Sequence, residues 1–237
     1  MRTSPLLVGL MILHSQPAMA DAPVSPDNAR MELDRATRVS LWATNYYLIE
    51  VKSSKGAGSV LIRNLNNEAI GPSISRKDWC SAAMEGSLRV EGIVFNYAGT
   101  RDPRQTDCSH APSERVRWAK TSHPFGTGSR NNPLVPFRTL ACDLGGLASS
   151  RPWLHGGYPR FGQRIYIPKA KGIKLPDGTS HNGIFHCGDT GGLITGNHID
   201  VFIGAVAGGE SGARRVNPFP FIRSSPRYPF EAYVLPD

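Results

Sequence analysis

Two carboxylates, Asp189 and Asp200, stand at either end of a glycine-rich segment near the C-terminal end of the chain. Four glycines between positions 188 and 196 let the backbone turn tightly and let another group approach it closely. After this turn, the segment 199–203 alternates aliphatic residues with Asp200 and Phe202, which predicts a strand with its aliphatic face in a core and its other face open. A carboxylate beside an aromatic ring on an open face suits a site that acts on carbohydrates.

The chemistry that these residues suggest is the cleavage of a glycosidic bond. This reaction requires an acid that protonates the leaving oxygen, and hydrolases usually add a second carboxylate that activates water or attacks the anomeric carbon. An alternative is aspartic protease chemistry, because Asp189-Thr190-Gly191 is also a D-T-G motif. Such a site needs two aspartates that share a proton, so a chain with a single D-T-G would have to act as a symmetric dimer.

The segment 163–204 resembles the three-aspartate (3D) domain, which occurs in the membrane-bound lytic transglycosylase A family and in secreted cell-wall hydrolases of the stationary-phase survival type. Asp189 and Asp200 match the middle and last aspartates of the family motif, which is close to D-T-G-G-x-I-x-G-x-x-I-D-V-Y. Farther upstream, the segment 42–47 is similar to the A-T-x-Y strand that opens the domain.

The first aspartate of the motif is assigned to Asp143. The segments 139–143 and 158–168 are similar to the family's A-x-D-P and I-P-L-G-T-x-V-Y-I-P segments. Three features depart from the family: Leu144 follows the aspartate where proline is usual, about a dozen extra residues lie between Asp143 and Gly162, and residues 169–181 form a further insertion. We expect both insertions to be surface loops, because long surface loops cost little free energy.

The resemblance implies a lytic transglycosylase that cleaves the MurNAc-GlcNAc β-1,4 bond of peptidoglycan and leaves a 1,6-anhydro end, with Asp200 as the single acid/base. The pKa of Asp200 must then be raised, and we expect Asp189 and Phe202 to raise it by charge and by burial. Asp189 and Asp143 complete the candidate catalytic set. The candidate substrate-binding residues are Thr44, Tyr46, Tyr47, Thr190, Gly191, His198 and Phe202. The main alternative is a non-catalytic module that binds cell-wall polysaccharide, as in expansin-like proteins.

The first twenty residues predict an export signal. Arg2, the apolar run 6–13 and the segment Ala18-Met19-Ala20 have the arrangement of a secretory signal peptide, and the run is too short to span a bilayer. No cysteine follows the predicted cleavage site closely, so we predict no lipid anchor in the membrane after cleavage. We expect the protein to act as a monomer in the periplasm or cell wall. The formal charge of +8 is scattered along the chain, which favours the anionic glycan strands of peptidoglycan as partners over nucleic acid.

The cysteine content predicts disulfides. The chain has four cysteines, an even number in a protein bound for an oxidising compartment: Cys80, Cys108, Cys142 and Cys187. Three pairings are possible, and if the aspartates converge as the resemblance implies, Cys142 pairs with Cys187 and Cys80 with Cys108. A zinc site built from Cys187, His186 and His198 is the alternative, but the usual ligand spacing is missing. We therefore predict neither a metal nor another cofactor.

The elements that must position these residues are mainly strands. With 25 glycines and 19 prolines, the composition indicates a β-rich protein with long loops. The expected strands are 41–51, 58–64, 88–97, 134–142, 163–168, 183–188 and 199–204, with a helix at 76–85, an irregular segment at 100–132 and a tail at 216–237 that wraps the surface. We divide the chain into a signal peptide (1–20), a linker (21–40) and one domain (41–237), for which the resemblance implies a six-stranded double-psi β-barrel with one or two short helices.

Overall fold

The computed structural model describes residues 32–101, 116–145 and 157–236. The predicted signal peptide, much of the predicted linker, and Cys108 lie outside the described residues. The described chain is mainly β, as predicted, with these strands: β1 (Thr37–Val51), β2 (Val60–Arg63), β3 (Ala69–Ile74), β4 (Ser87–Val90), β5 (Ile93–Thr100), β6 (Val116–Thr121), β7 (Thr139–Ala141), β8 (Arg164–Tyr166), β9 (Ile184–Asp189), β10 (His198–Ala207) and β11 (Phe230–Val234). The helical segments include α2 (Arg76–Glu85), α3 (Gly209–Val216) and the short 3-10 turns η1 (Ser129–Asn131) and η2 (Pro168–Ala170).

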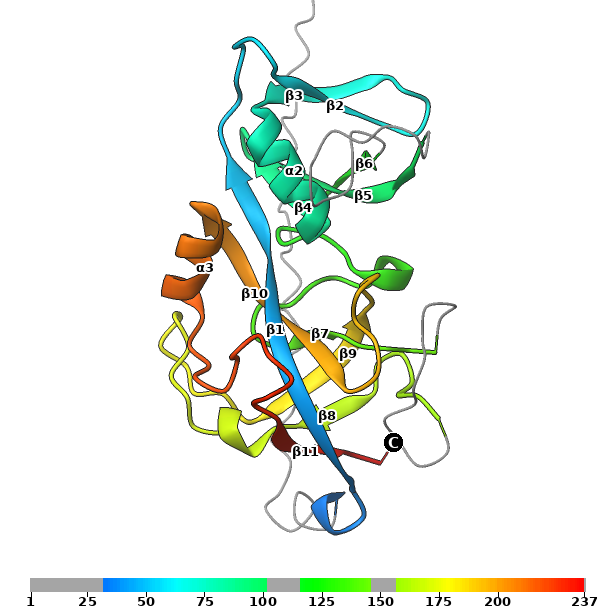
Figure 1. Cartoon of the computed structure of the whole chain (residues 1–237), viewed down its shortest axis with the longest axis vertical. Helices are drawn as coiled ribbons and strands as arrows, with labels where there is room; N and C mark the ends of the chain where they lie inside the picture. The colour runs from blue at the N-terminus through cyan, green and yellow to red at the C-terminus, as the bar shows by residue number, and fades with distance from the viewer. Residues whose placement is uncertain (1–31, 102–115, 146–156, 237) are drawn as a thin grey trace, which may run out of the picture.

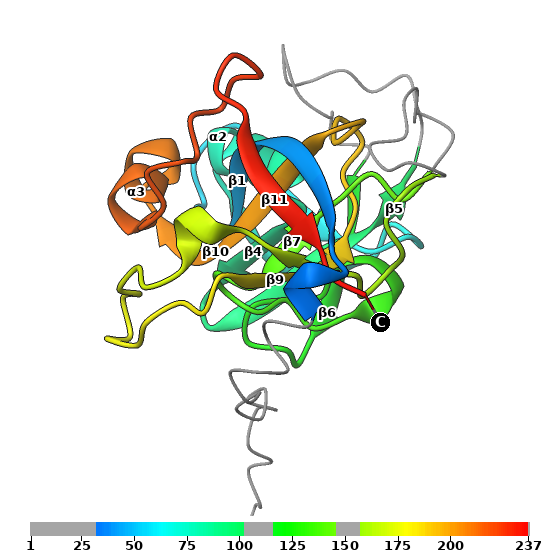
Figure 2. The same ribbon diagram turned by 90° about the horizontal axis from the view of Figure 1, so that it is seen from below.

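Strands from both ends of the described chain close into a ring. The order of pairing is β10-β7-β9-β8-β11-β1, and β1 also pairs with β10, which completes the ring (Figure 2). The β1–β10 and β7–β9 pairs are parallel and the other pairs in the ring are antiparallel. The ring therefore has the number of strands that the resemblance implies, and the double-psi crossing of its connections stays a prediction.

The long strand β1 connects the two parts of the molecule (Figure 1). Its first part lies in the ring, and its end pairs with β4, from which the sheet continues through β5 to β6. The hairpin of β2 and β3 and the helix α2 complete this upper part. Strand β1 begins at Thr37 and pairs with β11 from that residue on, so it starts before the expected strand 41–51, and the division into linker and domain stays a prediction.

Alternation along β1 and β10 separates two hydrophobic clusters. Odd-numbered residues such as Leu41, Ala43 and Ile199 enter the main core, as the period of two predicts. Even-numbered residues lie on the other face, where Tyr46 and Phe202 belong to a second, smaller cluster. The candidate site lies on this even-numbered face.

The upper part of the molecule differs from expectation in two places. The predicted strand 88–97 is a hairpin of β4 and β5, because Glu91 and Gly92 both have positive φ (49° and 77°), as a tight two-residue hairpin turn requires. Strand β6 lies within the segment 100–132 that was expected to be irregular. The predicted helix is confirmed as α2, which the Ser75 side chain caps by accepting a hydrogen bond from the Asp78 amide.

The C-terminal tail is part of the core, so the prediction that it wraps the surface is wrong. Strand β11 lies between β8 and β1 in the ring, and Phe230, Ala232 and Val234 are buried at alternate positions. The insertion 169–181 is also anchored to the core at its end. His181 is 1% exposed; its Nδ1 accepts a hydrogen bond from the Gly183 amide and its Nε2 contacts the Phe137 carbonyl oxygen.

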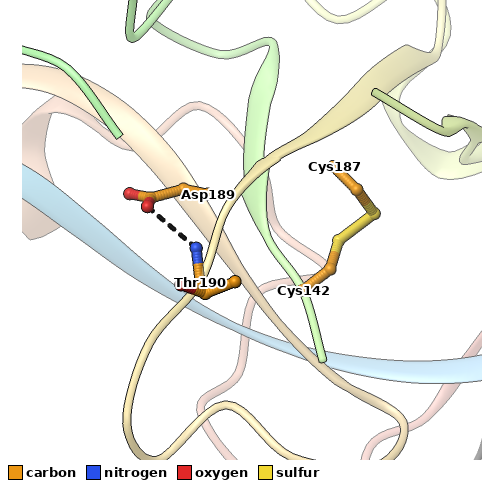
Figure 3. Close-up of a disulfide and its surroundings, with 4 residues drawn as sticks. All are labelled: Cys142, Cys187, Asp189 and Thr190. Carbon is orange, nitrogen blue, oxygen red and sulfur yellow. Dashed lines mark hydrogen bonds between the residues drawn. A yellow bond between two sulfur atoms is a disulfide. The ribbon is translucent and has the colours of Figure 1, made fainter. Parts of the chain in front are cut away.

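The predicted disulfide between Cys142 and Cys187 is confirmed, with a Cα–Cα distance of 5.6 Å (Figure 3). It joins the end of β7 to β9, close to Asp189. Cys80 is also disulfide-bonded, and its predicted partner Cys108 lies outside the described residues. Because the sulfur of Cys187 is held in the disulfide, the alternative zinc site with a Cys187 ligand is wrong.

Candidate active site

The parallel register of β1 and β10 sets the geometry of the candidate site. Trp42 lies beside His198, Thr44 beside Asp200 and Tyr46 beside Phe202. All six residues point to the even-numbered face, because side chains two residues apart on a strand share a face. The pairing therefore places two segments about 155 residues apart in sequence into one constellation.

Asp200 is the carboxylate that is best placed to exchange a proton. Its Oδ1 accepts a hydrogen bond of 2.7 Å from the Thr44 hydroxyl, and the residue as a whole is half-buried. Burial, together with a smaller effect of the negative charge of Asp189, raises the pKa of Asp200 to about 7, although the hydrogen bond from Thr44 opposes the change. Asp200 can therefore carry a proton near neutral pH.

Asp189, in contrast, is held firmly by hydrogen-bond donors. Its Oδ1 accepts from the Ser129 amide (2.9 Å), the Ser129 hydroxyl (3.1 Å) and the Thr190 amide (2.8 Å), and its Oδ2 accepts from the Tyr46 hydroxyl (3.0 Å) (Figure 3 shows the bond from Thr190). Burial raises the pKa of Asp189, whereas all of these bonds favour the charged form. Asp189 is therefore a fixed acceptor whose lone pairs are largely used.

The close approach of Ser129 to Asp189 depends on a glycine. A Cβ at Gly128 would lie 2.7 Å from the Asp189 carboxyl carbon, which is closer than real side chains come. Gly128 has an ordinary φ of −87°, so the reason for glycine here is space and not backbone conformation.

Asp143 holds the glycine-rich turn in place. It is 4% exposed, its Oδ2 accepts from the Gly196 amide at 2.7 Å, and its Oδ1 accepts from the Gly145 amide at 3.0 Å. These bonds connect the end of β7 to the turn between β9 and β10. Asp143 thus has the contacts of a residue that supports the turn, and its assignment as a catalytic residue stays a prediction.

The aromatic residues differ in their relation to the site. Tyr46 reaches it through its hydroxyl, and burial strongly raises the pKa of this group, so Tyr46 stays a hydrogen-bond donor. Phe202 lies on the predicted face but is 0% exposed, because Leu134 and Ile194 belong to the cluster that covers it. Tyr47 is buried in the main core. Phe202 and Tyr47 are therefore not on an open surface of this structure, and their assignment as substrate-binding residues stays a prediction.

The remaining predicted binding residues lie around the turn. Thr190 and Gly191 are exposed, and the Thr190 hydroxyl is 2.7 Å from the Ser129 hydroxyl. His198 is 8% exposed; its ring stacks on Trp42 with a centroid distance of 3.6 Å, and its Nε2 is 2.8 Å from the Thr44 hydroxyl oxygen. Thr44 therefore contacts both Asp200 and His198.

Several residues near the site carried no role in the sequence analysis. Ser129 and Gly128 lie in a segment expected to be irregular, and no motif marked them. Glu85, the last residue of α2, accepts a hydrogen bond from the Tyr47 amide, and burial raises its pKa to about 8. The charge of Asp200 adds to this increase, so Glu85 is a further carboxylate in the electrostatic surroundings of Asp200.

Comparisons with known proteins find one matching domain family and similar folds. The family described as the 3D domain matches residues 157–217, a range that contains Asp189 and Asp200 but not Asp143. E. coli MltA with bound chitohexaose is similar in structure, with 15% sequence identity, a TM-score of 0.54, and coverage of 85% of this chain and 75% of that chain. A membrane-bound lytic murein transglycosylase from Agrobacterium tumefaciens is 15% identical, with a TM-score of 0.50 and coverage of 90% and 80%. No curated protein sequence matches the chain.

These findings confirm the predicted resemblance. Residues 157–217 match the 3D domain, and the fold of the chain is like that of MltA. At 15% identity the structural likeness concerns the fold, so the chemistry must be argued from the residues of this chain.

Proposed function

We propose that this 3D-domain protein is a peptidoglycan lytic transglycosylase that cleaves the MurNAc-GlcNAc β-1,4 bond with Asp200 as its single acid/base. The observation that carries the proposal is the state of Asp200: a half-buried residue whose pKa is about 7, next to a carboxylate whose lone pairs are largely used by donors. Asp200 can therefore be protonated when substrate binds. The 3D-domain match and the fold shared with MltA support the same assignment.

In the proposed reaction one proton leaves Asp200 and one returns. Asp200 first gives its proton to the glycosidic oxygen as the bond from this oxygen to C1 of the muramic acid breaks, so the leaving sugar departs with a hydroxyl group. The Asp200 carboxylate then takes the proton of the C6 hydroxyl while the C6 oxygen attacks C1. This step closes a 1,6-anhydro ring and restores the protonated Asp200, so no water is consumed.

The role that we propose for Asp189 is electrostatic. A hydrolase needs a second carboxylate with a free lone pair for water or for the anomeric carbon. Asp189 is held by the Ser129, Thr190 and Tyr46 donors and is therefore poorly suited to that task. As a fixed negative charge it raises the pKa of Asp200 and favours the positive charge that develops at C1.

The proposed substrate is also consistent with the charge of the chain. The formal charge of +8 would attract the chain to anionic wall polymers. MltA was crystallised with chitohexaose, a glycan, in the structure that this fold resembles. Of the helices in residues 32–101, 116–145 and 157–236, none has the length and apolar character needed to cross a membrane. Action in the periplasm or cell wall as a monomer is part of the proposal.

The mass of the reaction products tests the proposal directly. Purified peptidoglycan incubated with the protein should release muropeptides with 1,6-anhydro ends, which are lighter by one water than hydrolysed ends in mass spectrometry. Reducing muramic ends would instead indicate a hydrolase. Sedimentation of the protein with insoluble peptidoglycan without release of muropeptides would indicate a binding module, and either result would contradict the proposal.

The change Asp189→Asn should shift the pH dependence of the reaction. The neutral amide removes the charge that helps to raise the pKa of Asp200, so Asp200 should lose its proton at a lower pH. The alkaline limb of the kcat profile should therefore move toward lower pH, while burial keeps part of the increase in pKa. The profile is measured as muropeptide release between pH 4 and 9.

A matched control is Asp177→Asn, which removes a carboxylate from an exposed position in the insertion 169–181. This variant has the same change in charge and should leave the profile in place. The prediction is contradicted if the alkaline limb of the kcat profile of Asp189→Asn moves toward higher pH, or if it coincides with that of Asp177→Asn. Either result would show that the charge of Asp189 does not raise the pKa of Asp200.

A further inference from the structure

A continuous chain of hydrogen-bonding groups connects His198 to Asp200. The His198 Nε2 lies 2.8 Å from the Thr44 hydroxyl oxygen, and this oxygen lies 2.7 Å from Asp200 Oδ1. Thr44 is on β1, while the two residues that it connects lie two positions apart on the paired strand β10. The positions of these three hydrogen-bonding groups are thus set by the strand register and not by a loop.

The chemistry of the hydroxyl group limits the possible directions of these bonds. Thr44 has a single hydroxyl proton and can donate to only one neighbour. An ionised carboxylate can only accept. Whenever Asp200 is ionised, Thr44 must therefore donate to Asp200, and the short contact between His198 Nε2 and Thr44 is a hydrogen bond only if His198 is the donor.

The contact on the other side of the imidazole ring competes only weakly with this direction. His198 Nδ1 is 3.4 Å from the Leu193 carbonyl oxygen, so a proton on Nδ1 would make a hydrogen bond longer than an ordinary N–H···O bond. The contact at Nε2 is much shorter, so the geometry favours a proton at Nε2. Stacking on Trp42, with an angle of 7° between the ring planes, fixes the orientation of the imidazole.

We propose that His198 is a positioning residue that donates from Nε2 to Thr44 and so fixes which oxygen of Asp200 exchanges protons with the substrate. The proposal rests on the function proposed above. With Thr44 held as a donor to Oδ1, that oxygen is occupied, and the proton passes to and from Oδ2. The same oxygen then gives its proton to the glycosidic oxygen and takes one from the C6 hydroxyl, with no net loss of protons.

Loss of the His198 donor would allow a competing arrangement. Without it, the Thr44 hydroxyl is free to rotate away from Asp200, and a proton on Oδ1 can be donated to the Thr44 oxygen. The acid proton would then point into the protein and not toward the substrate. Turnover should fall, whereas substrate affinity should change little, because neither His198 nor Thr44 needs to contact the glycan for this role.

The first test observes the ring directly and needs no activity. In protein labelled with ¹⁵N at histidine, long-range ¹H–¹⁵N NMR at pH 9 should show His198 as the neutral tautomer with its proton on Nε2. Asp200, whose pKa is about 7, is ionised at this pH. Thr44→Val should change the ring ¹⁵N shifts and weaken the tautomer preference. A proton on Nδ1 in the wild-type protein, or shifts that do not respond to Thr44→Val, would overturn the proposal.

The second test separates positioning from packing. His198→Phe preserves a ring next to Trp42 but removes the donor, and His198→Gln places an amide donor near the position of Nε2. His198→Phe and Thr44→Val should each lower kcat by about 10–100-fold with KM within about twofold, and the double variant should be no worse than either alone. His198→Gln and Thr44→Ser should each recover about tenfold over these variants.

His123→Gln, a histidine substitution outside the chain of bonds, should leave kcat unchanged. Additive losses in the double variant, or a loss that appears in KM alone, would overturn the proposal. If wild-type protein releases no muropeptides at all, the proposed function fails, and the NMR result still decides whether His198 donates to Thr44.

Discussion

The change Asp200→Asn is expected to lower the rate of muropeptide release by about 10²–10⁴-fold or more, while binding to peptidoglycan survives. The amide keeps the size of the carboxyl and can still contact Thr44, but it cannot give and take a proton. Kinetics on purified peptidoglycan, with a co-sedimentation assay for binding, measure the two effects separately. A variant that still forms anhydro ends at the native rate would contradict the assignment of Asp200.

The stability of the same variant provides an internal control. The folded-state pKa of Asp200 is about 7, above the ordinary value of about 4 for an aspartate. Between these two pH values, Asp200 is protonated in the native protein and ionised in the unfolded chain. The contribution of Asp200 to the stability of the wild-type protein therefore decreases as the pH rises from about 4 to about 7. Asp200→Asn removes this dependence, so its Tm relative to wild type should be higher at pH 8 than at pH 4. A folded and more stable variant without activity would exclude unfolding as the cause of the loss.

The central part of the site could be predicted because it is encoded locally. The turn with its glycines, the alternation that follows and the match to the 3D motif all lie within a short stretch that carries Asp189 and Asp200. Thr44 was predicted from the resemblance of its strand, and the parallel register then places it beside Asp200. The disulfide of Cys142 followed from the expected convergence of the aspartates.

What covers or contacts these residues could not be predicted, because the partners come from distant segments. The period of two gives the face of Phe202 correctly, but the residues that bury it come from other strands and loops, such as Leu134 and Ile194. In the same way, Ser129 contacts Asp189 across a sequence separation of 60 residues, and no local pattern marks it. A pattern along one strand contains no information on such contacts.

The errors in the fold have a similar origin. Strand β11 does alternate, with Phe230, Ala232 and Val234 buried, but it is short and stands among prolines, so its neighbourhood suggested an irregular tail. Its strand conformation is stabilised by pairing with β1 and β8, which lie far away in the sequence. Local propensity is weak where long-range pairing decides the conformation.

Removal of the Cys142–Cys187 disulfide is expected to destabilise the protein by about 4 kcal/mol. The bridge closes a loop with a sequence separation of 45, and closing a loop of this length restricts the unfolded chain by about that amount. The double variant Cys142→Ala/Cys187→Ala should therefore unfold at a lower urea concentration, with a folding equilibrium constant reduced by about 10³-fold. Urea unfolding at several pH values measures the difference in free energy of unfolding.

The control for this variant is a comparison under reducing conditions, where the wild-type protein and the double variant both lack the Cys80 disulfide and the Cys142–Cys187 cross-link, and the wild type alone keeps the two buried sulfurs. The two proteins should be destabilised to a similar extent, and the remaining difference measures the packing of the sulfur atoms. The bridge also lies next to the site: Asp143 follows Cys142, and the Cys142 amide donates to the Asp189 carbonyl oxygen at 3.0 Å. Because Asp143 holds the Gly196 turn, loss of the bridge should also lower turnover. A free-energy difference below about 1 kcal/mol would show that strand pairing, and not the disulfide, restrains this part of the site.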